Sequence, residues 1–141
     1  MSILDAETLH DSILQERSCG LVTVDVQPKS AHSVDSFVST FGFKPLGGDW
    51  RSIDRQTALQ VLHRVLERDL AYDVQLIEPA RAHLLAESFL SLFSASAHFC
   101  TNGSMESDGL GWSPITESTF DHGVIAHDDH SIGIIWVQDE D

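Results

Sequence analysis

The sequence predicts an α+β fold in a single domain: an antiparallel helical pair packed on a small, mostly antiparallel β-sheet that ends in a C-terminal hairpin. Three observations predict this fold. Leucines recur every three or four residues between 59 and 70, an apolar stripe at helical spacing follows Pro79, and two β-branched runs lie near the end of the chain. With 141 residues, 42% of them hydrophobic, the chain is long enough to form one core without disulfide bonds.

The first fifty residues are expected to form a helix, a strand and a short second helix. The β-branched run that begins at Leu21 stops at Pro28, as a strand would. Ser33 or Ser30 can cap the next helix, and Gly42 suits its C-terminal end. The expected elements are a helix over 5–15, a strand over 21–26, a helix over 34–41 and a loop over 44–48.

The helical pair is the clearest feature of the sequence. Asp54 or Ser52 can cap the first helix, whose leucines form one face. Pro79 suits the first turn of the second helix, and the apolar stripe of that helix ends at Phe93. Only about ten residues connect the two helices, which favours an antiparallel arrangement. Each buried leucine or phenylalanine contributes about 1.5–3 kcal/mol, so this pair is expected to dominate the stability of the fold.

Strands are expected in the last third of the chain. The run from Ile132 to Val137 is apolar on both faces, so it should lie inside the sheet or be covered on both sides, with Trp136 in the core. A flexible loop is expected from Asn102 to Trp112. The remaining expected elements are strands over 97–101 and 123–127 and a hairpin turn over 128–131.

Charge is divided unevenly along the sequence. All eight lysine and arginine residues lie at or before Arg81, whereas ten aspartates and glutamates follow it. The formal net charge of −14 therefore divides into about −4 for the first part and about −10 for the second. A surface of this kind attracts cationic proteins and repels phosphate. We therefore expect a basic protein partner, and neither nucleic acid nor a membrane surface.

The cysteines and the N-terminal residues indicate the compartment. Cys19 and Cys100 are too few for a disulfide framework, which favours a reducing environment. The first twenty residues carry acids and lack the pattern of a signal peptide, and no apolar run is long enough for a membrane span. Gly47 and Gly48 precede an aspartate instead of the lysine of a phosphate loop. The sequence thus predicts a cytoplasmic protein without a cofactor.

Two clusters of residues could support metal binding or catalysis instead of partner binding. His127 and His130 flank two aspartates, an arrangement that could bind a metal, although an exposed hairpin turn often has the same composition. His98 and Cys100 would share one face of a strand and could form an imidazole–thiolate pair, although residues at this spacing are more often simply half-buried. A glycosidase-like pair of carboxylates stays open too, because an acidic protein offers many pairs.

The C-terminal two-thirds of the chain share a layout with a known class of proteins. The residues concerned are Asp69-Leu70-Ala71-Tyr72, the helix from Ala80 to Phe93, Phe99, Thr101-Asn102-Gly103, Gly111-Trp112, Phe120-Asp121 and Ile135-Trp136-Val137-Gln138-Asp139-Glu140-Asp141. This layout resembles small acidic bacterial immunity proteins, which neutralise toxins delivered to neighbouring cells by contact-dependent or secretion-system routes. The resemblance implies a non-enzymatic inhibitor that binds a basic toxin domain stoichiometrically, nucleases being one class of such toxins.

Charge and resemblance together predict the surface that binds the toxin. We expect an electrostatic face on the C-terminal part and an aromatic anchor from a glycine-rich loop, with Trp50 as the other candidate anchor. Two alternatives stay open: an accessory or chaperone-like adaptor for a secreted effector, and a small enzyme that uses Cys100, His98 or a carboxylate pair. The expected face consists of Glu106, Asp108, Asp128, Asp129, Asp139, Glu140 and Asp141, with Trp112 as the anchor.

Overall fold

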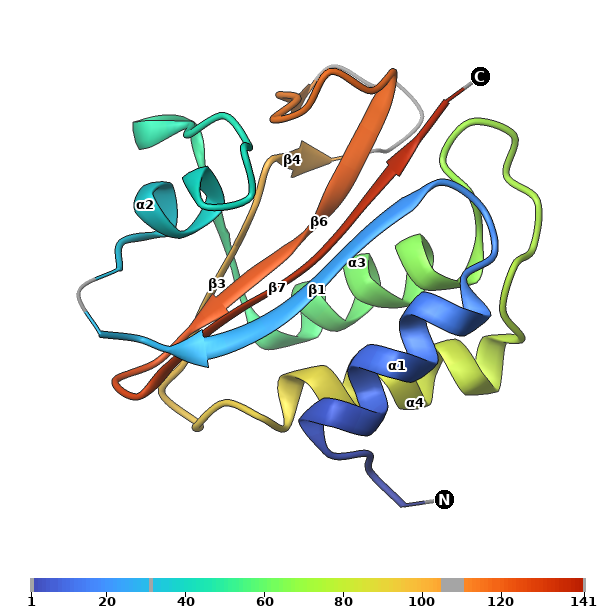
Figure 1. Ribbon diagram of the computed structural model, residues 1–141, viewed down its shortest axis with the longest axis horizontal. Helices are drawn as coiled ribbons and strands as arrows, with labels where there is room; N and C mark the ends of the chain where they lie inside the picture. The colour runs from blue at the N-terminus through green and yellow to red at the C-terminus, as the bar shows by residue number, and fades with distance from the viewer. Residues whose placement is uncertain (1, 31, 105–110, 141) are drawn as a thin grey trace.

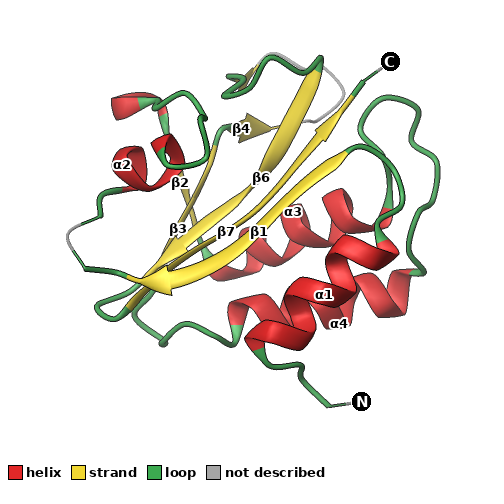
Figure 2. Cartoon of the chain, in the orientation of Figure 1, coloured by secondary structure: helices red, strands yellow, loops and turns green. Residues whose placement is uncertain are grey.

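A five-stranded sheet in the order β1-β7-β6-β3-β2 forms the centre of the computed structural model, which describes residues 2–30, 32–104 and 111–140. Neighbouring strands of this sheet are antiparallel (Figure 2). A second, two-stranded sheet pairs β4 (Gly103–Ser104) with β5 (Gly111–Trp112). The five strands of the main sheet are β1 (Leu21–Pro28), β2 (Arg51–Ile53), β3 (His98–Thr101), β6 (Phe120–His127) and β7 (Ser131–Asp139).

Three helices cover one face of the sheet, and a smaller layer covers the other (Figure 1). Successive residues of a strand point to opposite faces and so supply two cores. Val124 and Ile135 pack with the three helices, whereas Ile125 and Trp136 pack with Phe37 on the opposite face. The helices of the larger layer are α1 (Ala6–Glu16), α3 (Arg55–Glu67) and α4 (Pro79–Leu90), and the smaller layer contains α2 (Val34–Ser39) and the 3-10 turn Gly47–Asp49.

The α+β prediction is confirmed, including the antiparallel helical pair and the C-terminal hairpin of β6 and β7. The structure also decides between the candidate caps: the Asp54 carboxylate accepts a hydrogen bond from the Thr57 N–H at 2.7 Å, and the Ser33 hydroxyl accepts one from the Ser36 N–H at 3.1 Å. Pro79 occupies the first turn of α4 as expected.

Several elements differ from the prediction, among them α2, which ends at Ser39 instead of residue 41, and the expected loop over 102–112, whose two ends pair as β4 and β5. The helix α4 ends at Leu90, although the apolar stripe continues to Phe93, because the chain turns there and Phe93 still reaches the core. Strand β6 begins at Phe120, three residues before the predicted start, and includes the polar pair Asp121-His122. Strand β2 was not predicted, because a run of three residues carries no periodicity that sequence reasoning can detect.

Strand β7 is buried along most of its length. It pairs with β1 on one side and β6 on the other, and both of its faces are covered. Trp136 is fully buried, as expected for a core tryptophan, and its ring meets that of Trp50 edge-on at 6.2 Å between centroids. Within the described ranges, no helix has both the length and the apolar character that crossing a membrane requires.

Candidate partner-binding surface

Asp139, at the end of β7, is not a surface carboxylate, which corrects the prediction for this residue. Its side chain is 1% exposed and forms a two-pronged ion pair with the fully buried Arg17, at 3.0 and 2.8 Å. The Leu70 N–H donates to the same carboxylate at 2.8 Å. Gly20 approaches it so closely, with φ at +71°, that a Cβ there would collide with the carboxylate. Asp139 therefore holds the molecule together and is unavailable to a partner.

Asp128 is likewise engaged within the fold. It is only 9% exposed, and its carboxylate accepts hydrogen bonds from the N–H groups of Ser94, His130 and Ser131, each at 2.8 Å. These bonds, the one from Ser94 foremost, lower the pKa of Asp128. The residue thus fixes the β6–β7 turn, whereas the neighbouring Asp129 is exposed. Of the two turn aspartates predicted for the face, only Asp129 presents its side chain freely to solvent.

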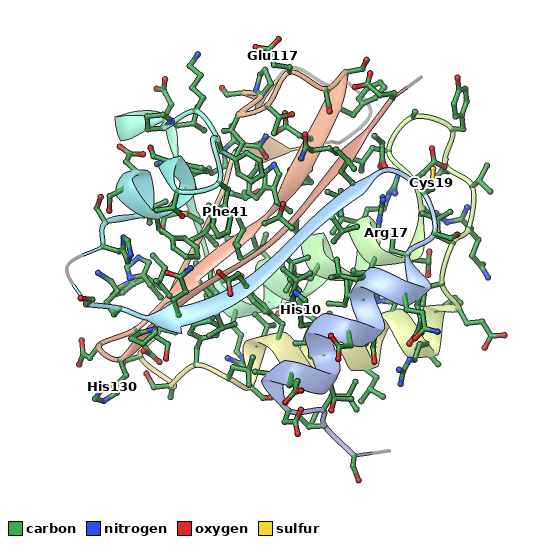
Figure 3. All side chains as sticks on the ribbon, viewed as in Figure 1. His10, Arg17, Cys19, Phe41, Glu117 and His130 are labelled. Atoms are coloured by element: carbon green, nitrogen blue, oxygen red, sulfur yellow. The ribbon has the colours of Figure 1, made fainter. Side chains whose placement is uncertain are left out.

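The two groups of predicted acids lie at opposite ends of β7. The strand from Ser131 to Asp139 separates the β6–β7 turn from the C-terminal end, a distance of about 26 Å over eight residue intervals at roughly 3.3 Å each. Figure 3 shows the same separation, with His130 of the turn at the lower left and Glu117 at the top. The described acids of the predicted face therefore do not form one continuous patch.

The C-terminal end of β7 presents two exposed carboxylates, Glu117 and Glu140. Glu140 accepts hydrogen bonds from the hydroxyl and the N–H of Thr119, at 2.6 and 3.3 Å, and these bonds lower its pKa. The Ser118 hydroxyl donates to the Gln138 side chain at 3.2 Å, which holds the loop that carries Glu117 against β7. Both contacts bring the two carboxylates to the same end of the sheet.

Two large exposed apolar side chains belong to elements at the same end of the sheet. Leu21 is 65% exposed and lies opposite Gln138 in the β1–β7 pair. Tyr72 is 66% exposed, in the loop that Leu70 ties to Asp139. Exposed apolar side chains rimmed by charge are typical of protein-binding surfaces. We call Leu21, Tyr72, Glu117 and Glu140 the C-terminal end surface.

A cavity of about 570 Å³ opens beside this surface. Phe41 and Phe43 supply apolar walls, and Lys44, Glu117 and Gln138 supply polar ones. The Lys44 N–H donates to the Ile115 carbonyl at 2.8 Å and so joins the two loops that border the cavity. Its mixed lining suits a side chain of a partner protein.

Part of the predicted face lies outside the described residues. Glu106, Asp108 and Asp141 belong to that part. For the predicted anchor Trp112, the structure describes the backbone, in the pair with Gly103, but not the side chain. Trp50, the other candidate anchor, is half-buried, and its indole N–H donates to the Asp35 carboxylate at 2.6 Å. This bond and its contact with Trp136 give Trp50 a role in packing.

Burial makes Cys100 a poor nucleophile. Desolvation, with a smaller contribution from Asp35, raises the pKa of its thiol to about 12, so the reactive thiolate is scarce at neutral pH. The ring of His98 faces that of His127 across the sheet, at 5.4 Å between centroids, and the structure gives no hydrogen bond between His98 and Cys100. These observations weaken the cysteine-based alternative.

The histidines of the hairpin turn do not assemble a metal centre with the aspartates. Among the residues that the structure describes, no group of three or more histidine, cysteine, aspartate or glutamate side chains is placed to hold a metal ion. The main-chain N–H of His130 is bonded to the Asp128 carboxylate at 2.8 Å, whereas His127 lies by Lys29 and His98. Burial, followed by the electrostatic effects of Lys29 and His98, lowers the pKa of His127.

A buried polar network at the start of β6 was not predicted from the sequence. Asp121 is fully buried and accepts hydrogen bonds from the side chains of Asn102, Thr116 and Trp136 at 3.1, 2.8 and 3.1 Å. The other amide end of Asn102 meets Nδ1 of His122 at 2.7 Å. No buried side-chain nitrogen or oxygen in the described ranges lacks a partner. A network satisfied to this degree positions loops and is typical of a structural role.

The only sequence signal for this network was a pair of polar residues, Asp121 and His122, immediately before an apolar run. That pattern is common at strand ends exposed to solvent, so it could not identify a buried site.

Comparisons of the chain with protein-family models, with curated proteins and with solved structures found no match.

Proposed function

We propose that this protein is a cytoplasmic, immunity-type inhibitor that binds a basic protein toxin domain and acts by occupying it, without catalysis of its own. The observation that carries the proposal is the joint presence of exposed carboxylates and exposed apolar side chains on the C-terminal end surface. Exposed carboxylates orient a cationic partner and speed its association, and the burial of apolar side chains slows its dissociation.

The distribution of ion pairs supports a cationic partner. Arg17, Arg64, Arg68 and Arg81 are each paired with a carboxylate of the chain. At least four of the eight basic side chains are neutralised in this way, together with the carboxylates that pair with them, and the net charge of −14 stays on the remaining groups. The hydrogen bonds from Thr119 lower the pKa of Glu140 and so favour its charged form.

The partner-binding surface in this proposal differs from the one expected from the sequence. Asp139 contributes through its ion pair with Arg17, which fixes the end of β7, and leaves the contact itself to Glu117 and Glu140. Leu21 and Tyr72 take the anchoring role that was assigned to a tryptophan. In this proposal the protein blocks a basic cleft of the toxin domain through complementary shape and charge.

Co-expression with a basic toxin domain tests the function. We expect restored growth and a stoichiometric complex in size-exclusion chromatography with light scattering. Growth without a complex, or a complex that leaves the toxin active, would contradict inhibition by binding. The second result would instead favour an adaptor that holds its partner without blocking it.

The electrostatic part is tested with matched pairs of substitutions. Glu117→Gln with Glu140→Gln should slow association and flatten its dependence on salt, because both remove charge from the C-terminal end surface. Asp49→Asn with Glu78→Gln removes the same charge from other exposed sites and should leave association close to that of the parent protein. Equal association rates for the two double variants, measured by stopped flow at low and high salt, would reject this surface.

A further inference from the structure

Strand β1 is an edge strand of the main sheet, and its central residue, Val24, is 7% exposed beside α1. It pairs with β7 along its whole length, from Leu21 opposite Gln138 to Pro28 opposite Ser131, without a bulge. It stands first in the strand order, at the front of the view in Figure 1, with α1 running below it. Regular edge strands of this length can pair with a strand from another chain.

The ladder fixes which backbone groups of β1 point outward. The Lys29 N–H donates to the His130 carbonyl at 2.8 Å, directly after the strand. Hydrogen-bonded pairs alternate along an antiparallel ladder, so the groups of Val22, Val24 and Val26 face away from β7. Among the described residues, none forms a hydrogen bond with these outward N–H and C=O groups.

Carboxylates flank this edge. A cavity of about 200 Å³ between α1 and β1 is bordered by Glu7 and His10 of the helix and by Asp25 of the strand. Figure 3 shows His10 in this gap. Helix α1 contains no lysine or arginine. Asp25 lies midway along the strand, and its charged side chain discourages pairing between two copies of the chain while favouring a cationic strand.

We infer that β1 binds an extended, cationic segment of the protein partner by strand addition, with lysine or arginine at alternate positions on the face of the sheet that carries Asp25. The inference rests on the proposed function and names the element that holds the partner. Strand addition on β1 is continuous with the C-terminal end surface, because Leu21 belongs to both. Main-chain pairing gives the affinity, and the carboxylates select the charge.

A short peptide of alternating lysine and threonine, acetylated and amidated, is the probe. Hydrogen exchange followed by NMR should show slowing of at least about tenfold for the amides of Val22, Val24 and Val26 at saturating peptide. The amides of Thr23 and Asp25, which already face β7, should change little. A peptide of glutamate and threonine should not bind.

Two controls separate strand pairing from charge attraction. The lysine peptide with N-methyl groups on the residues that face β1 should lose binding, because it cannot form the ladder. Asp25→Lys should weaken binding of the unmodified peptide at least about tenfold, whereas Asp49→Lys makes the same charge change elsewhere and should not. Equal binding of the methylated peptide, or protection at sites other than these three amides, would overturn the inference.

The outcome is distinguishable from that of the proposed function. If Asp25→Lys abolishes peptide binding but still restores growth beside the toxin, the partner is held elsewhere and β1 is not its dock. If the peptide binds β1 as described but no toxin is neutralised, strand addition stands and the inhibitor function falls.

Discussion

Arg17 illustrates how a single residue can join separate elements. Its guanidinium donates to the Val65 and Cys19 carbonyls at 2.7 and 2.6 Å, in addition to the two oxygens of Asp139. Helices α1 and α3 and strand β7 therefore meet at one buried cation. A buried charge of this kind is tolerated only while its partner is present.

Asp139→Ala should destabilise the protein by about 3–5 kcal/mol, because it leaves Arg17 buried without a counter-charge. Urea unfolding followed by circular dichroism measures this loss. Glu140→Ala removes the next carboxylate, which is exposed, and should leave the free energy of unfolding nearly unchanged. Equal losses for the two variants would contradict the assignment of Asp139 to the core.

His122 gives the fold a defined response to pH. Burial, with a smaller contribution from Arg64, lowers the pKa of this imidazole from 6.5 to about 4. The unfolded chain therefore binds a proton that the folded protein excludes. Stability is unaffected by this group above pH 6.5 and falls as the pH decreases from there towards 4.

We expect the slope of unfolding free energy against pH between 6 and 5 to be steeper in the parent protein than in His122→Gln, by up to roughly 1.4 kcal/mol per pH unit. Glutamine keeps a donor for Asn102 but cannot titrate. Urea unfolding at a series of pH values measures the difference. Parallel pH profiles would show that His122 is already accessible to protons in the folded state.

At the scale of elements, the long periodic segments were predictable and the short ones were not. Helix α3 and strand β7 each carry a pattern that one period explains, and both lie where expected. Strand β2 is too short to show a period. The candidate surface was less predictable, because the ion pair of Asp139 with Arg17 joins residues from opposite ends of the sequence and has no local signal.

The β6–β7 pair depends on close approach at Gly123, which lies opposite Trp136. A Cβ at this position would collide with the Ile135 carbonyl and crowd the Trp136 ring. Gly123→Ala should therefore destabilise the protein by about 1–3 kcal/mol. Gly48→Ala is the matched control, since a Cβ there meets no atom within 4 Å. Thermal unfolding of the two variants tests the expectation, and similar midpoints would refute it.

At the scale of the whole molecule, excess negative charge opposes compactness. A net charge of −14 on 141 residues repels itself, and dissolved salt screens that repulsion. Raising sodium chloride should therefore raise the midpoint of thermal unfolding. The rise should be smaller for Glu117→Gln with Glu140→Gln, which carries less charge. A midpoint independent of salt in the parent protein would indicate that the acids are too far apart to repel.

The pairing of β1 with β7 also determines when the fold can be completed. Leu21 cannot pair with Gln138, nor Arg17 with Asp139, until those residues have been synthesised. Strand β1 therefore pairs with β7 only after nearly all the described chain has left the ribosome. Contacts between such distant segments make folding slow. Until β7 has been synthesised, nascent β1 exposes both of its edges, and chaperones that shield extended apolar segments would find their substrate there.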